Sequence, residues 1–239
     1  MKNTDIFFNP FRIISPKLDK EASRLEQLHQ AAPEDVTCLE EGLLVMVSKI
    51  EEMTSLLRKS LILADQAKFD RCAALATEIH DEEKKLTDHV VVCAPKEVSG
   101  EILRALVMIP GRLERVGDLL ESVLNVSRIK SRDGIVFSDK AYEELDKLFN
   151  GFMELLNNFK DALATRNALL LRTVTEQANG LATMCAEFAL THEQRLVAGL
   201  CSSRGSSLFL DVLYSVKNAK AHIREVCLRL LALEENPTG

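Results

Sequence analysis

Apolar side chains recur at intervals of three and four residues along most of the chain, and this spacing constrains the fold more than any other feature. The clearest stretch carries it on seven residues: Leu39, Leu43, Met46, Ile50, Met53, Leu57 and Leu61. Such intervals place one apolar stripe along a helix that packs into a bundle, whereas a half-buried strand needs strict alternation. With 46% hydrophobic residues but only 10 Gly and 6 Pro, the composition also favours helices around a core. The pattern predicts an all-α fold.

Breaks in the apolar pattern divide the chain into two similar halves. The first three helices are expected over residues 34–67, 70–92 and 99–129, and the next three are expected to begin at Ser138, Asn167 and Leu208. The first repeat covers residues 34–130 and the second covers residues 138–235, which together predict one domain, a duplicated three-helix bundle. Residues 1–33 form an N-terminal extension, in which Pro16 favours the start of one short extra helix.

Charge and composition exclude several classes of protein. The 30 Lys and Arg residues are outnumbered by 36 Asp and Glu, giving a net charge of −6, whereas nucleic-acid-binding proteins present a concentrated basic surface. No apolar run approaches the roughly 20 residues that span a bilayer, and the first residues lack a signal-peptide pattern. The six cysteines form no C-x-x-C pair and are expected to be free thiols. We therefore expect a soluble cytoplasmic protein that binds no nucleic acid.

The third expected helix carries a line of polar residues beside its apolar stripe. Glu114, Asp118, Glu121 and Asn125 follow at steps of four, three and four residues, which align them on the helix surface. Two carboxylates four residues apart repel each other, and Gly117 costs about 1 kcal/mol relative to alanine inside a helix. We expect a cation shared by Glu114 and Asp118 to offset the repulsion, and the close approach of another backbone to explain Gly117.

The second expected helix offers carboxylates that could complete a metal site. Glu78 and Glu82 lie one turn apart, and Glu82 falls within the apolar spacing of that helix. Facing Glu114 and Asp118, they would present four carboxylates, a ligand set that suits Mg, Ca, Mn or iron better than zinc. The same stretch, residues 78–85, also has the composition of a solvated helix face, so both interpretations stay open.

Other motifs of metal enzymes and nucleotide-binding proteins are missing from the sequence. The five histidines form no H-x-x-x-H pair and no paired Glu-x-x-His motifs, which disfavours a ferritin-like di-iron oxidase. His80 and His89 are interpreted as solvated helix residues. No G-x-G-x-x-G, P-loop or G-x-S-x-G string occurs. The sequence therefore predicts no catalytic residue and favours a protein that is not an enzyme.

The string LERVGD at residues 113–118 resembles the Leu-Glu-Arg-Ile-Gly-Asp motif of the PhoU family. In that family the motif lies on the third helix of a three-helix repeat that occurs twice per chain, a plan that matches most of this sequence. The resemblance implies metal clusters bound by E-x-x-x-D carboxylates, here Glu114 and Asp118, with Glu78 and Glu82 as ligands from the second helix. The implied metal is a divalent or trivalent ion, with iron, manganese, magnesium and zinc as candidates.

The second repeat departs from this motif. Tyr214 stands where the motif has glutamate, Asn218 stands where it has aspartate, and Lys217 stands where it has glycine. A metal cluster is therefore expected in the first repeat only. Lys217 places a positive charge in the second repeat where the first is expected to hold a cation.

The resemblance also implies a function. It implies a cytoplasmic regulator of phosphate uptake and phosphate signalling, which docks onto a phosphate transporter component, a sensor histidine kinase or both. Such a protein reaches the membrane only through these partners and forms a homodimer. Two alternatives stay open, a carboxylate-bridged metal hydrolase or oxidase and a metal-free helical adaptor. An apolar N-terminal cluster either supplies the docking surface or covers the bundle: Phe7, Phe8, Phe11, Ile13 and Ile14.

Overall fold

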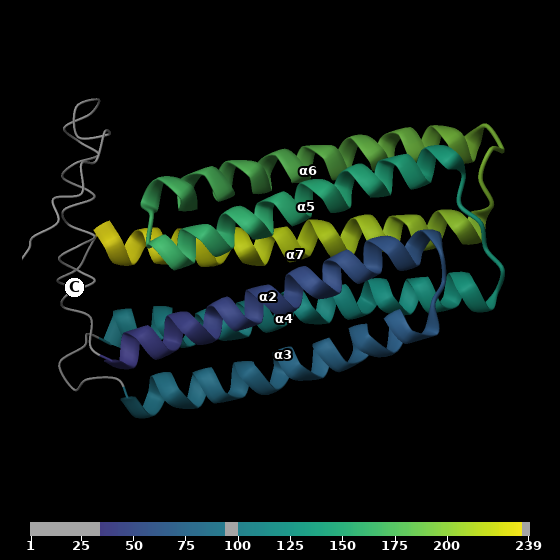
Figure 1. Ribbon diagram of the computed structural model, residues 1–239. Coiled ribbons are helices and arrows are strands. Elements are labelled where there is room, and N and C mark those ends of the chain that lie inside the picture. The colour runs from purple at the N-terminus through teal and green to yellow at the C-terminus, as the bar shows by residue number, and fades with distance from the viewer. Residues whose placement is uncertain (1–33, 94–99, 236–239) are drawn as a thin grey trace, which may run out of the picture. The chain divides into compact units, whose positions relative to one another are not determined.

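The computed structural model describes residues 34–93 and 100–235, and over these ranges it contains six α-helices and no strand (Figure 1). The helices are α2 (Glu34–Ile62), α3 (Gln66–Cys93), α4 (Gly100–Arg132), α5 (Asp139–Thr165), α6 (Ala168–Val197) and α7 (Ser203–Glu235). The chain divides into two units after Cys38, and the helical bundle belongs to the unit that begins at Leu39. The predicted all-α fold is confirmed, while the expected short helix near Pro16 lies outside the described residues. None of the described helices is long and apolar enough to cross a membrane.

Three helices form each half of the bundle, as the duplicated sequence pattern predicts. In the first half α3 packs against α4, and in the second half α6 packs against both α5 and α7. The halves meet where α4 packs against α7, so the third helix of each repeat lies at the junction (Figure 1). Ion pairs from Lys49 to Glu78 (3.3 Å) and from Lys160 to Glu51 (2.7 Å) place α2 beside α3 and α5.

The predicted apolar stripes form the core of this bundle. All seven stripe residues of α2 are buried, and the largest buried side chains of α5 are Phe149, Phe152 and Phe159. Full burial of one such side chain contributes about 1.5–3 kcal/mol. The stripe of α4 is buried as well, from Leu113 to Leu120, which leaves the polar line beside it at the edge of the core.

Side-chain caps fix the start of two helices, α3 and α5. The sequence predicts one helix as far as Ala67, but α2 ends at Ile62 and a new helix follows. The reason is Asp65, whose carboxylate accepts a hydrogen bond from the backbone N–H of Ala67 (3.0 Å) and so caps α3. Ser138 caps α5 as predicted, because its hydroxyl accepts from the N–H of Ala141 (3.3 Å).

The connection between α6 and α7 is shorter than the sequence predicts. The helix that begins after the Asn167 cap was expected to end at Thr191, but it continues to Val197. The last helix begins before the predicted Leu208, because the Ser202 hydroxyl accepts from a backbone N–H three residues later (3.1 Å). The serine-rich stretch was expected to be a loop. In the structure Ser202 caps α7, and the residues from Ser203 onward form its first turn.

The four described cysteines are free thiols, as predicted. Cys72, Cys185 and Cys227 are buried in the bundle, whereas Cys201 is half-buried. Burial raises the pKa of the Cys72 and Cys185 thiols to about 11. These buried thiols stay protonated at neutral pH and act as small apolar core residues.

Candidate functional site

Gly117 sets the register between α3 and α4 at the motif of the first repeat. A Cβ atom at this position would lie 3.2 Å from Cγ2 of Ile79, tighter than ordinary van der Waals contact. The glycine therefore makes room for the Ile79 side chain of α3, whereas the sequence predicted the close approach of a backbone. Because Ile79 lies against Gly117, the residues next to it on α3 come within reach of the polar line on α4.

Glu114 forms its contact across this interface with His80. Nδ1 of His80 lies 3.0 Å from Oε1 of Glu114, and the Glu114 side chain is only 17% exposed. His80 is exposed, as the sequence interpretation expected, and it also pairs with a carboxylate. The sequence pattern alone did not show this pair, because it depends on the register between two helices.

The cation shared by Glu114 and Asp118 is an arginine of their own helix. Nη1 of Arg115 donates to Oδ2 of Asp118 (2.8 Å), and its Nε lies 3.9 Å from Oε2 of Glu114. The guanidinium group therefore offsets the repulsion between the two carboxylates. The sequence predicts a shared cation here, and in this structure a side chain supplies it.

Glu78 belongs to a different network, between α2 and α3. Its carboxylate accepts from Nη1 of Arg71 (2.7 Å) and lies 3.3 Å from Nζ of Lys49. Arg71 also donates to both carboxylate oxygens of Glu52, at 2.7 and 2.9 Å. The hydrogen bond from Arg71 is the main reason why the pKa of Glu78 lies below its ordinary value. Glu78 thus faces α2 through its ion pairs.

The four predicted metal ligands do not converge. The side chain of Glu82 is mostly covered and makes a long contact with Nζ of Lys85 (3.5 Å), while Asp118 is engaged by Arg115. Over residues 34–93 and 100–235, no group of three or more His, Cys, Asp or Glu side chains is placed to hold a metal ion. The pair of Glu114 and His80 supplies two donors, so as arranged these residues do not fit a metal cluster. The metal site stays a prediction.

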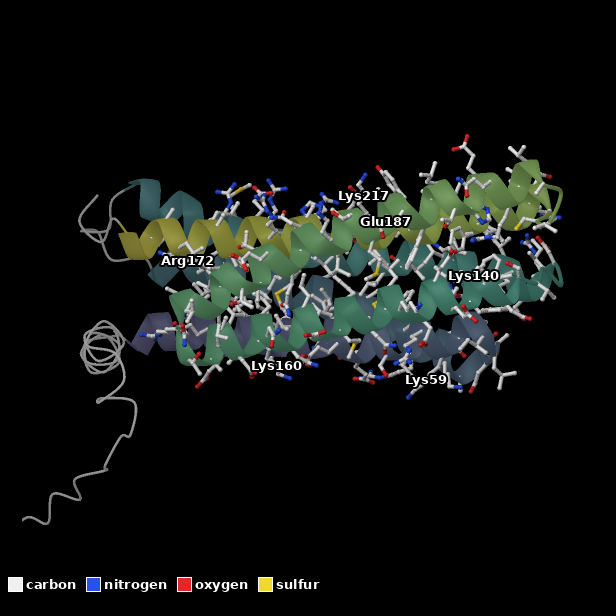
Figure 2. All side chains as sticks on the ribbon, turned by 90° about the horizontal axis from the view of Figure 1, so that it is seen from above. Lys59, Lys140, Lys160, Arg172, Glu187 and Lys217 are labelled. Atoms are coloured by element: carbon white, nitrogen blue, oxygen red, sulfur yellow. The ribbon has the colours of Figure 1, made fainter. Side chains whose placement is uncertain are left out.

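The equivalent face of the second repeat carries no acidic pair. Tyr214 is exposed, and Asn218 donates to the backbone carbonyl of Tyr214 (2.9 Å). Lys217 projects from the surface of the bundle, on a side where nitrogen atoms of basic side chains gather (Figure 2). The departures from the motif therefore give this repeat a basic face in place of an acidic one.

A buried ionic cluster joins the three helices of the second repeat, and nothing in the sequence pattern marks it. Glu144 of α5, only 2% exposed, accepts from Arg195 of α6 (2.8 and 2.5 Å) and from the Thr191 hydroxyl (3.1 Å). His192 stacks on Phe209 of α7, with 4.4 Å between ring centroids. Each charge in this cluster has a partner of opposite sign, which indicates a structural role.

One end of the bundle exposes large apolar side chains in three connections. These connections meet there, since Asp133 after α4 pairs with Arg204 at the start of α7 (2.5 Å), and Arg58 of α2 pairs with Asp146 of α5 (2.7 Å). The residues of this apolar end are Ile62, Leu63, Val136, Val197 and Leu200. Val197 is 84% exposed. Exposed apolar groups of this size often mark protein interaction sites.

Comparison with known proteins places this arrangement in a known fold. No family model and no curated protein matches the chain. PhoU from Pseudomonas aeruginosa is similar in structure, with a TM-score of 0.72 and 17% identity over 84% of this chain and 98% of that one. The phosphate transport system regulatory protein PhoU from Streptococcus pneumoniae has a TM-score of 0.71 and 14% identity, over 82% and 93% of the two chains. The PhoU-like fold predicted from the α4 motif is confirmed.

Proposed function

We propose that this protein regulates phosphate uptake and phosphate signalling by docking onto other proteins, without catalysing a reaction. The observation that carries the proposal is the structural likeness over more than four fifths of the chain to two PhoU proteins, one of them described as a phosphate transport system regulatory protein. The partners that follow are a component of a phosphate transporter, a sensor histidine kinase, or both. A cytoplasmic location and a homodimer, implied by the same resemblance, belong to this proposal.

The apolar end is the surface best suited to docking among the described residues. Its five side chains are exposed in the free protein, so a partner that covers them removes apolar area from water. Burial of one such side chain contributes up to about 1.5–3 kcal/mol, and a few well-buried contacts dominate most interfaces. The N-terminal cluster predicted to supply the docking surface lies outside the described residues.

Two potential nucleophiles inside the bundle contact helix carbonyls. The Ser127 hydroxyl donates to the carbonyl of Val123 (3.1 Å), and the Cys185 thiol contacts the carbonyl of Leu213 (3.8 Å). These potential nucleophiles are engaged with helix carbonyls and have no adjacent general base in these contacts. Such an interior favours a scaffold that presents surfaces.

The test compares two aspartate variants, one single and one double, at opposite ends of the second repeat. In cells that lack the protein, we expect phosphate uptake to be misregulated across starvation and refeeding. Wild-type protein and the control Leu169→Asp, which alters an exposed leucine at the start of α6, are expected to restore regulation. A Val197→Asp, Leu200→Asp variant with an unchanged melting temperature is expected to fail and to lose co-purification with transporter components. Normal regulation in cells lacking the protein would contradict the proposal.

A further inference from the structure

Three basic residues line one side of α7 next to α6. Lys217, Lys220 and Arg224 follow at steps of three and four residues, so they lie on one face and span about 10 Å along the helix. Cys185 of α6 lies against this face, because its thiol contacts the Leu213 carbonyl and both lysines partly offset the rise that burial causes in the pKa of the thiol. The three cations therefore border the packing interface between α6 and α7.

Lys220 is a buried cation without a partner. It is 7% exposed, and it forms neither an ion pair nor a hydrogen bond with any residue that the structure describes. Burial is the main reason why the pKa of Lys220 is lowered; Cys185 opposes the shift, while Arg224 and Lys217 add to it by repulsion. No carboxylate acts on this ammonium group in the described part of the chain. Nζ of Lys220 is not among the buried atoms that lack a hydrogen bond, so the ammonium group reaches water and is accessible to an ion from solution.

The first repeat shows that this position can be filled by an apolar residue. On α4 the buried stripe runs through Val116 and Leu120, and on α7 the same spacing runs through Val216 and Lys220. A leucine at the α7 position would fill the space without any cost of burying a charge. The lysine therefore places an accessible positive charge where the first repeat has an apolar side chain.

The neighbouring charges do not neutralise this face. Nε of Arg224 is buried and has no hydrogen-bond acceptor among the described residues. The adjacent acid, Glu225, points to the other side of α7, where Arg112 and Arg229 both bind it at 2.8 Å. Lys217 forms no ion pair with the described residues either. Three positive charges within about 10 Å thus have no ion-pair partner among the residues that the structure describes.

We infer that the α6–α7 face binds a small tetrahedral oxyanion of the phosphate class, held by Lys217, Lys220 and Arg224. Lysine ammonium groups supply compact positive charge, and a guanidinium group offers paired donors that match two oxygens of such an anion. The bound anion would neutralise the mutual repulsion of the three cations and give the ammonium group of Lys220 an acceptor. The inference rests on these charges alone and would hold whatever regulatory role the protein has.

Direct binding of inorganic phosphate to the full chain tests the inference. Isothermal titration calorimetry, with chloride at equal ionic strength as the reference, is expected to show one site per chain. Lys220→Met is expected to weaken phosphate binding about tenfold or more, because it removes a charged donor from the centre of the three cations. The control Lys147→Met alters an exposed lysine of α5 and is expected to leave affinity unchanged. Lys220→Met is also expected to keep or raise the melting temperature, since an apolar residue fills the same position in the first repeat.

Arg224→Gln keeps the test decisive if Lys220→Met does not fold. This variant is expected to weaken phosphate binding while the thermal shift caused by phosphate disappears. The inference is overturned if wild-type protein binds no phosphate up to about 10 mM. It is equally overturned if both Lys220→Met and Arg224→Gln bind phosphate as tightly as the Lys147→Met control. Neither outcome depends on phosphate regulation in cells, so the proposed function and this site can fail separately.

Discussion

Replacing Arg195 by methionine removes the guanidinium group that pairs with Glu144 inside the second repeat. Glu144 is 2% exposed, and two of its three hydrogen bonds come from Arg195, at 2.8 and 2.5 Å. In Arg195→Met the carboxylate keeps only the Thr191 hydroxyl as a donor among these contacts. Breaking a buried ion pair from one side costs about 3–5 kcal/mol, because the remaining charge is left without compensation. We expect the free energy of unfolding to fall by about that amount.

Urea unfolding followed by circular dichroism measures this loss. The matched control is Arg115→Met, which breaks an exposed arginine–aspartate pair on α4 and is expected to cost less than about 1 kcal/mol. Arg195→Met combined with Glu144→Gln is expected to recover part of the loss, because a neutral amide replaces the unpaired charge. A loss in Arg195→Met no larger than in the control would refute the argument that this pair stabilises the packing of α5 on α6.

Three further predictions concern other parts of the chain. Mutating both Glu114 and Asp118 to alanine is expected to abolish stoichiometric metal in protein purified without an affinity tag, as measured by elemental analysis; unchanged metal content would exclude this site. Gly180→Ala is expected to raise the free energy of unfolding by up to about 1 kcal/mol, because the glycine lies inside α6 and a Cβ there meets no atom within 4 Å. The pKa of His192 is lowered, first by burial and then by Arg195, so the unfolded chain takes up a proton more readily than the folded one. Its contribution to stability is therefore present above its unfolded pKa of about 6.5 and is lost as the pH falls below it; a His192→Gln variant with the same loss of stability between about pH 7 and pH 5 would contradict this.

The fold could be predicted from the sequence because it depends on a property that each helix carries alone. The stripe that begins at Leu39 repeats every three or four residues, and every member of it is buried in the structure. Helix ends were less predictable, because a cap is one short side chain that competes with the continuing apolar pattern. Asp65 ends the expected first helix early, and Ser202 starts the last helix early.

The contacts of the candidate site depend on the register between two helices. The sequence of one helix alone does not specify that register. Glu114 and Asp118 are where the motif predicts them, on one line beside the core. Their partners follow from the register that Gly117 imposes, which brings His80 to Glu114 at 3.0 Å. Glu78 likewise pairs with Lys49 of α2, and the spacing of acidic residues on α3 and α4 carries no information about that helix. The spacing thus predicted the line of carboxylates but not their partners.

The two halves of the bundle share one helical plan but carry opposite charge at equivalent places. In the first half, Arg115 and His80 contact the carboxylates of α4 from within the chain. In the second half, a leucine of the core stripe is replaced by Lys220, and the described residues leave this charge open. The stem of Lys220 is covered while its ammonium group reaches water, so the charge is available to a ligand from outside the fold. The second half, which lacks the sequence motif, is therefore the half whose charges call for a bound anion.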